Sequence, residues 1–256
     1  MIYKNLQTVD NPKGTVIIVH GIAEHSGRYL DLSNRLNSEG YDVLTYDHLG
    51  HGKSSGKRGK IKSFKDHLNV LRQLVLEQKS RNDNKIFLLG HSMGGGIVNL
   101  YGVTYDDVDG IVSVAAASHT PSNTKALKYT GFWYLRWVRI NTKIFDKHLA
   151  HDPNVLASNK EDDLMLKYIY VSLIGEMFIK GVKYIDKNAK NFTVPVLYIH
   201  GTADNIVQQE ASIMMYEKIS SKDKEIKLYD GEFHELLNDY NKEEPINDII
   251  VWLNKH

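Results

Sequence analysis

The sequence lacks cysteine, a surplus of charge of either sign and any long apolar run. Without cysteine the chain forms no disulfide, thiol nucleophile or thiolate metal site, which excludes cysteine proteases and zinc sites built on cysteine. Lys and Arg number 32 against 31 for Asp and Glu. The net charge of +1 therefore gives no reason to expect nucleic acid or an anionic surface as the main partner.

Two further absences concern export and membranes. The first residues lack the charged-then-apolar pattern of a signal peptide, and no apolar run approaches the roughly 18 residues of a membrane span. We therefore expect a cytoplasmic protein.

Buried strands alternate with amphipathic helices over most of the chain. Apolar, largely β-branched runs predict strands at residues 15–19, 43–46, 86–89 and 111–114. A capping box at residues 63–66 starts one of the intervening helices. This alternation is typical of a doubly wound α/β fold, with a mostly parallel sheet and helices on both faces. We expect a single domain over residues 1–256.

The alternation stops between residues 118 and 191. Aromatic and aliphatic side chains cluster there at 132–137 and 168–171, whereas strands are expected again at 195–201 and 226–229. We interpret residues 118–191 as a helical cap inserted into the α/β domain. A last helix is expected around Pro245, since proline is tolerated in a first helical turn.

The pentapeptide Gly-His-Ser-Met-Gly at 90–94 follows a predicted strand and precedes a helix. A Gly-x-Ser-x-Gly motif in this context is typical of a nucleophile elbow, in which a tight turn leaves the serine hydroxyl pointing outward. Ser92 is therefore the candidate nucleophile.

A glycine-rich connection at residues 47–59 could suggest phosphate binding. Its glycines are spaced too closely for a P-loop, and no NAD-type Gly-x-Gly-x-x-Gly follows a strand. We expect a structural loop in which Asp47 fixes the backbone, and we predict no cofactor and no metal ion.

Serine is a poor nucleophile at neutral pH and needs a base oriented by a carboxylate. In α/β-hydrolases the chain order is serine, acid, histidine. Of the 12 histidines, His234 fits this order best, whereas His200 at a strand end suits a structural, hydrogen-bonded role. Asp204, directly after a strand, is the preferred acid; Asp239 follows the histidine and is the alternative. The same arrangement predicts an oxyanion hole from the backbone N–H groups of Met93 and Ile22.

Four segments together carry a family likeness: residues 20–29, 47–54, 90–95, and 201–204 with Phe233 and His234. On these residues the chain resembles the monoacylglycerol lipase and lysophospholipase-like serine hydrolases of the α/β-hydrolase superfamily, over nearly its whole length.

The resemblance implies the same catalytic and oxyanion residues. It also implies that Glu24 and Arg28 lie near the polar end of the pocket, where such enzymes hold a glycerol head group. A salt bridge that only fixes the loop is the alternative for this pair. The segment before residue 15 is short for the two antiparallel edge strands usual in this family.

We therefore expect an esterase that cleaves a monoacyl lipid ester, foremost monoacylglycerol, through an acyl-serine. Lysophospholipids, short-chain esters and N-terminal peptide bonds are alternative substrates, since one triad serves them all. A non-catalytic ligand-binding protein on the same fold is a further alternative. The cap would receive the acyl chain and make transient contact with a membrane surface, unless its aromatic cluster belongs to the core.

Overall fold

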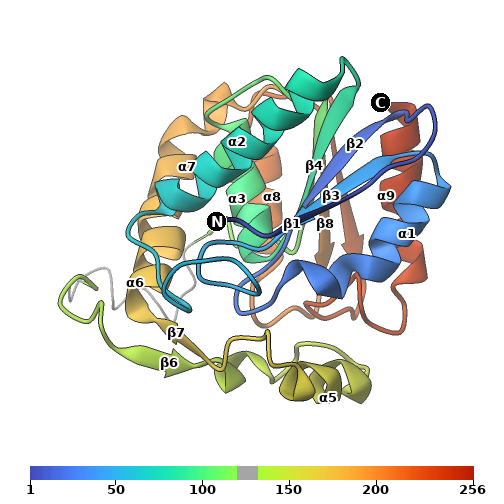
Figure 1. The fold of residues 1–256 in the computed structure, drawn as a ribbon. Coiled ribbons are helices and arrows are strands. Elements are labelled where there is room, and N and C mark those ends of the chain that lie inside the picture. Colours follow the sequence, from blue (N-terminus) through green and yellow to red (C-terminus); the bar gives the residue numbers. More distant parts are fainter. Residues whose placement is uncertain (120–131) are drawn as a thin grey trace.

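The computed structural model describes residues 1–119 and 132–256. Within these ranges, seven strands form one sheet in the order β1-β3-β2-β4-β5-β8-β9 (Figure 1). β1 is antiparallel to β3, and every other neighbouring pair is parallel. The strands are β1 (Lys4–Gln7), β2 (Gly14–Val19), β3 (Asp42–Tyr46), β4 (Lys85–His91), β5 (Gly110–Val114), β8 (Val196–Gly201) and β9 (Lys224–Tyr229).

The expected α/β fold is confirmed. The chain before β2 forms one antiparallel edge strand, β1, which pairs with β3. β1 is short and half exposed, with a burial pattern that gives no clear alternation. Its pairing with β3, rather than its own sequence, makes it a strand.

Helices cover both faces of the sheet because alternate strand residues point to opposite sides. In β2, Ile17 and Val19 join one apolar core, whereas Val16 and Ile18 join the other. The first core is covered by α2 (Phe64–Arg81), α3 (Met93–Gly102) and α8 (Glu210–Lys218), and the second by α1 (Leu30–Ser38) and α9 (Glu243–Lys255). The predicted capping box starts α2, whereas α8 was not predicted.

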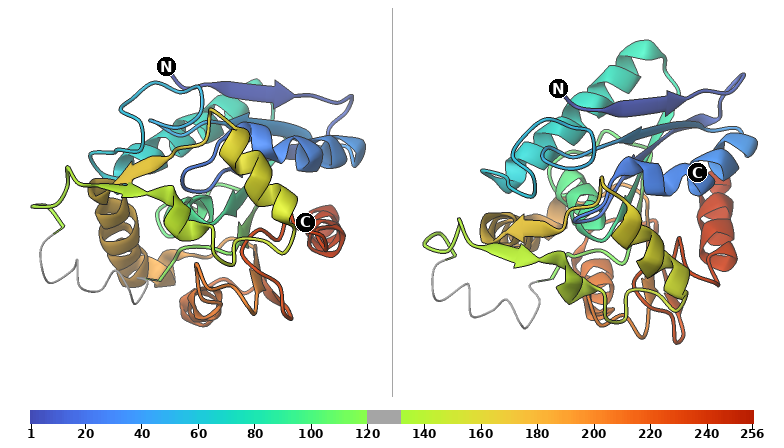
Figure 2. Two further views of the ribbon diagram at one scale, coloured as in Figure 1. Left: turned by 90° about the horizontal axis from the view of Figure 1, so that it is seen from below. Right: turned by 60° about the horizontal axis from the view of Figure 1, so that its bottom comes forward.

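The expected insertion contains strands as well as helices. β6 (Arg139–Asn141) and β7 (Tyr168–Tyr170) pair in antiparallel fashion, with the 3-10 helix η3 (Thr142–Phe145) and α5 (Pro153–Glu161) between them. Figure 2 shows these elements lying across one end of the molecule, next to the carboxyl ends of the parallel strands. Each strand has only three residues, too few to show an alternating pattern.

The segment after β7 packs differently. α6 (Val171–Ile174) leads into the π-helical segment η4 (Gly175–Gly181) and α7 (Val182–Asn188). η4 contacts α2 and α3, and α7 contacts α3. Their apolar residues Leu173, Met177 and Ile185 share the first core with Leu71 and Leu100. We call residues 132–170 the cap below, because they cover the strand ends instead of the sheet face.

In the described parts of the chain, no helix has both the length and the apolar character that crossing a membrane requires. The cytoplasmic location expected from the sequence stays a prediction.

Trp252 in α9 anchors that helix to the sheet, and its removal should weaken the whole fold. It is 2% exposed and packs edge-on against Phe87, with ring centroids 6.3 Å apart. Trp252→Ala should lower the free energy of unfolding by about 3 kcal/mol through cavity formation, measured by urea denaturation. Its neighbour Val251 is 58% exposed, so Val251→Ala is the matched control and should change stability by less than about 0.5 kcal/mol. Equal effects would contradict this packing.

Candidate active site

Ser92 lies on a strained turn between β4 and α3. Its backbone has φ 56° and ψ −116°, a conformation that costs a non-glycine residue on the order of 1–3 kcal/mol. The neighbouring glycines allow the strand and helix to approach closely: a Cβ at Gly94 would lie 1.9 Å from the Val19 carbonyl oxygen, and one at Gly90 would lie 2.3 Å from that of Gly94. Hydrogen bonding of the Ser92 N–H to Val114 O at 2.9 Å also holds the turn.

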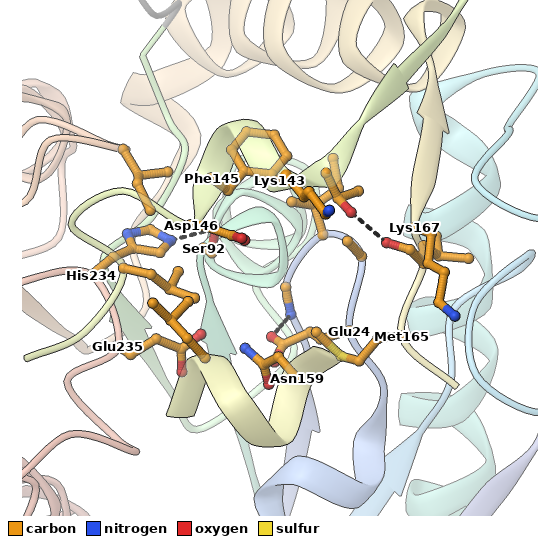
Figure 3. A pocket seen from close by; sticks show the side chains of 18 of the residues that line it. Glu24, Ser92, Lys143, Phe145, Asp146, Asn159, Met165, Lys167, His234 and Glu235 are labelled. Atoms are coloured by element: carbon orange, nitrogen blue, oxygen red, sulfur yellow. Dashed lines mark hydrogen bonds between the residues drawn. The ribbon is translucent and has the colours of Figure 1, made fainter. Parts of the chain in front are cut away.

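The structure brings the three predicted catalytic side chains together. The His234 ring lies with Nε2 2.8 Å from Ser92 Oγ (Figure 3). On the other side of the ring, Nδ1 lies 2.6 Å from Asp204 Oδ2. An ionised carboxylate only accepts hydrogen bonds, so His234 carries its proton on Nδ1 and its Nε2 accepts from the serine hydroxyl. This is the tautomer that a general base at Nε2 needs.

Asp204 is held in its ionised form. Burial alone would raise its pKa, but electrostatic interaction with His234 and hydrogen bonds from His200 and His234 outweigh burial and keep the pKa well below its usual range. Its other oxygen, Oδ1, accepts the N–H groups of Ile206 and Val207 at 2.8 and 2.9 Å. These bonds fix the carboxylate toward His234.

The two rivals from the sequence have structural roles. His200 Nδ1 lies 2.8 Å from Ser212 Oγ and its Nε2 lies 2.8 Å from Val207 O, which confirms the expected hydrogen-bonded role. Asp239 accepts the backbone N–H of His151 at 2.7 Å and that of Asp152 at 2.9 Å. It therefore joins the cap to the core, and its carboxylate accepts from these cap residues instead of the catalytic histidine.

The predicted oxyanion donors flank Ser92. Met93 is the first residue of α3, where the helix dipole favours negative charge, and Ile22 follows the end of β2. Among the described residues, neither amide N–H has a hydrogen-bond acceptor. Both amides are thus free to bind an anion, and their role stays a proposal.

Glu24 and Arg28 form part of a buried ion network at the pocket wall. Arg28 Nη1 lies 2.5 Å from Glu24 Oε2 and 3.0 Å from Glu235 Oε1. Burial opposes the charge of each carboxyl group, but the Arg28 charge lowers the pKa of Glu24 and of Glu235. Glu24 Oε1 also accepts the Tyr29 hydroxyl at 2.8 Å and the Gly21 N–H. The pair therefore fixes the loop and also lines the pocket.

Sequence reasoning missed Glu235 and the contacts of His91. Glu235 lies 207 residues from Arg28 along the chain, so no local pattern could predict their pairing. His91 Nε2 lies 3.1 Å from the His234 carbonyl oxygen, and Nδ1 lies 3.4 Å from Glu24 Oε1. Burial opposes the charged form, but Glu24 and Glu235 raise the pKa of His91.

Two side-chain groups in the described residues have ligand atoms close enough to surround a metal ion: Glu24, His91 and Glu235, and His151, Glu232 and Asp239. In the first group, Arg28 already neutralises the carboxylates. In the second, Asp239 is occupied by backbone N–H groups. Neither arrangement calls for an ion.

A cavity of about 490 Å³ opens above Ser92 and His234. Its walls come from both the core and the cap, as the labelled cap residues Phe145, Asn159 and Met165 show (Figure 3). The apolar part of the wall consists of Ile22, Ala23, Phe145, Leu149, Leu156, Met165, Leu166 and Ile206. A pocket of this size and character suits a ligand with an apolar chain.

Behind the site, four buried histidines form a cluster that we call the histidine quartet: His20, His48, His51 and His67. In five of the six ring pairs, all except His20 with His67, the centroids lie 4.1 to 6.1 Å apart. Burial lowers the pKa of His20 to about 3 and of His51 to about 4, and also depresses that of His48 and His67. The quartet is therefore neutral at physiological pH.

The adjacent loop is fixed by Asp47, as expected. Its Oδ1 accepts the Ser26 N–H at 2.8 Å, and its Oδ2 accepts the Lys53 N–H at 2.7 Å. The glycine-rich connection is therefore a supporting loop in this structure.

Serine hydrolases of the α/β-hydrolase class place nucleophile, acid and base in this chain order and at these strand ends. The protein is an α/β-hydrolase. A family model described as serine aminopeptidase, S33 matches residues 10–241, and the chain belongs to that family.

Similar proteins are named as lipases of monoacylglycerol. The chain is 30% identical to the monoglyceride lipase of Mus musculus, over 88% of this chain and 76% of that one. It is 29% identical to the monoacylglycerol lipase of Mycolicibacterium smegmatis, over 96% and 90%. The crystal structure of the Paleococcus ferrophilus monoacylglycerol lipase superposes with a TM-score of 0.88 at 33% identity, covering 99% of this chain and 98% of that one. The family resemblance seen in the sequence is confirmed.

Acidification below pH 6.5 should destabilise the fold through the histidine quartet. Its members have depressed pKa values when folded but take up protons near pH 6.5 when unfolded. The stability is therefore fully present above that pH and is lost as the pH falls toward 4, by about 1.4 kcal/mol per pH unit for each histidine at full slope. The pKa of His91 is raised in the folded protein, so protonation of this residue stabilises the fold as the pH falls and partly offsets the loss.

Urea unfolding between about pH 7.5 and pH 5 measures this slope, above the range where most carboxylates titrate. Neither ring nitrogen of His67 has a partner among the described residues. The variant His67→Leu should therefore flatten the slope by about one proton. An unchanged slope would show that the pKa of His67 is not lowered in the folded protein.

Proposed function

We propose that the protein hydrolyses esters of a single fatty acyl chain, with monoacylglycerol as the preferred substrate, through an acyl-serine intermediate. The observation that carries this proposal is the hydrogen-bonded series from Asp204 through His234 to Ser92, which opens into a cavity with apolar walls. The names of the similar proteins support the substrate class.

In the first step Ser92 Oγ attacks the ester carbonyl while His234 Nε2 accepts the hydroxyl proton. The ionised Asp204 stabilises the imidazolium that forms. The Ile22 and Met93 amides bind the oxyanion, each contributing roughly 3 kcal/mol to transition-state binding. His234 then gives the proton to the leaving glycerol oxygen. Water attacks the acyl-serine with His234 again as base, which releases the fatty acid.

The polar wall suits the glycerol part of such a substrate. Glu24 and Arg28 border the cavity, and we propose that they bind glycerol hydroxyls while keeping their mutual ion pair. An aminopeptidase would instead need an unpaired carboxylate for the substrate's ammonium group. The two buried carboxylates of the wall, Glu24 and Glu235, are already paired with Arg28. Asp146 also lines the cavity, so the preference for ester over N-terminal peptide substrates rests on the names of the similar proteins.

Replacing Ser92 should abolish turnover without unfolding the protein. Ser92→Ala should remove labelling by a fluorophosphonate and lower kcat by at least about 10³-fold. Asp204→Asn should lower kcat by about 10⁴-fold, because the histidine would adopt the wrong tautomer. The matched control is Asp239→Asn, the rival acid, which should keep most activity.

Glycerol monoesters, p-nitrophenyl esters of graded chain length and aminoacyl anilides form the substrate panel. Turnover of the anilides equal to that of the glycerol monoesters would contradict the lipase proposal. Absence of fluorophosphonate labelling in folded wild-type protein would contradict the catalytic role of Ser92.

We further propose that the cap contacts membrane surfaces that carry anionic headgroups. Trp133, Tyr134 and Trp137 are 57%, 80% and 59% exposed. The Arg136 guanidinium lies 4.4 Å from the Trp133 ring centroid, and Lys60 Nζ lies 3.1 Å from that of Trp137. Exposed aromatic rings among cations suit the headgroup layer of an anionic bilayer. The overall charge balance of the chain conceals this local excess of positive charge.

The surface continues to the cavity through β6 and β7. Arg139 lies 5.4 Å from the ring centroid of Tyr168, and Tyr168 lines the cavity and is 47% exposed. A lipid taken from the membrane would therefore meet the cavity beside the contact surface.

Removing two cap tryptophans should weaken membrane binding but not chemistry. Trp133→Ala with Trp137→Ala should reduce cosedimentation with phosphatidylglycerol-containing vesicles by at least about fivefold, since each ring buries large apolar area. Turnover of a water-soluble short-chain ester should stay unchanged. Tyr240, 62% exposed and outside the cap, supplies the control Tyr240→Ala. Equal binding by the double variant and wild type would contradict the proposed surface.

A further inference from the structure

We propose that His20 is a positioning residue, which aims the Ile22 amide at the reacting carbonyl by holding the other side of the same peptide unit. This inference rests on the proposed hydrolysis and on the role of Ile22 as an oxyanion donor. It concerns a side chain that does not line the cavity.

The argument begins with the peptide that joins Gly21 to Ile22. A trans peptide is planar, so its C=O and its N–H point in opposite directions. His20 Nδ1 lies 2.8 Å from the Gly21 carbonyl oxygen and donates its proton to it. Fixing this carbonyl on the inner side therefore fixes the direction of the Ile22 N–H on the outer side.

The preceding peptide is held at both ends. The carbonyl oxygen of His20 accepts from His48 Nε2 at 2.9 Å, and the Gly21 N–H donates to Glu24 Oε1. Of the four polar backbone groups in these two peptides, three are thus bound and only the Ile22 N–H remains available among the described residues. The loop presents a single donor to the site in a fixed direction.

The hydrogen bonds also determine the tautomer of His20. Its Nε2 lies 3.0 Å from the backbone N of His48 and accepts that N–H, so the single ring proton must be on Nδ1. A second proton on Nε2 would face the His48 N–H and break this contact. The groups around the ring are His48, His51, His67 and Glu24. Burial of the ring lowers the pKa of His20 more than any of these neighbours changes it, so the ring stays neutral over the working range of pH.

The absence of a side chain at Gly21 is also needed for this loop conformation. A Cβ there would lie 2.6 Å from Glu24 Oε1 and 3.2 Å from Ser92 Cβ. The loop can therefore approach both the nucleophile and its own anchoring carboxylate.

Two polar substitutions separate the contacts of His20. In His20→Asn, the side-chain amide can donate to Gly21 O from near the former Nδ1 position. In His20→Gln, the longer amide can accept from the His48 N–H near the former Nε2 position, but it loses the donor to Gly21 O. We expect His20→Gln to lower kcat by about 100-fold, as loss of one oxyanion donor does, with KM changed less than about threefold. His20→Asn should keep at least tenfold more of the activity than His20→Gln.

A transition-state readout distinguishes positioning from general damage. The affinity of a trifluoromethyl ketone, which forms an oxyanion on Ser92, should fall by the same factor as kcat in each variant. The acidic limb of the pH profile should stay in place. His67→Leu alters the same buried cluster without touching Gly21, so it should preserve both kcat and ketone affinity.

Three results would overturn the proposal: equal activity in the Asn and Gln variants, a kcat loss without weaker ketone binding, or the same loss in His67→Leu. Thermal unfolding of every variant identifies any that does not fold, and the Asn and Gln pair is compared at a temperature where both are folded. If only one of them folds at any temperature, His20 is a folding residue and the proposal is wrong. Failure of wild-type protein to label with a fluorophosphonate would instead overturn the proposed function.

Discussion

The close approach of α3 to β2 at Gly94 is the constraint on which the site depends. A side chain at this position would overlap the Val19 carbonyl, so the helix can begin directly after the strand only because glycine is there. That geometry places Ser92 at φ 56° with its hydroxyl toward His234. The strain at one residue is offset by packing of the buried β4 and α3 around it.

Histidine serves two opposite purposes in this fold, and environment separates them. His234 has an ionised carboxylate on one side and a hydroxyl on the other, so it can take and return a proton. The histidine quartet has no carboxylate hydrogen-bonded to it in the described residues, and burial keeps it neutral. His20 and His48 thereby become fixed hydrogen-bond donors and acceptors that shape the loop beside the nucleophile. Histidine therefore can transfer protons at position 234 and has a structural, hydrogen-bonding role at positions 20 and 48.

The sequence predicted the parts of the molecule whose cause is local. Strands β2, β4 and β5 are buried along almost their whole length, so their residues show continuous apolar runs. The positions of Ser92, Asp204 and His234 followed from motif and chain order, and the structure places these side chains within hydrogen-bonding distance of one another.

Features that depend on partners distant in sequence were not predictable. β1, β6 and β7 are short strands defined by pairing, and Glu235 acquires its role from Arg28, 207 residues away. The hydrogen bonds of His20 likewise appear only when the loops after β2 and β3 meet.

The core supplies the reacting groups of the site, and the cap supplies much of the apolar wall of the cavity. Residues that move protons or bind the oxyanion lie on the turns at the carboxyl ends of β2, β4, β8 and β9, where the sheet fixes their spacing. The apolar wall at Phe145, Leu156 and Met165 comes from the cap, whose elements are short and joined to the core through Leu149, Leu166 and Asp239. Substitutions in the cap can therefore change the acyl chain that fits without disturbing the hydrogen bonds around Ser92. This separation explains why the catalytic residues can be predicted from local sequence motifs. The choice of substrate depends instead on the packing of the cap.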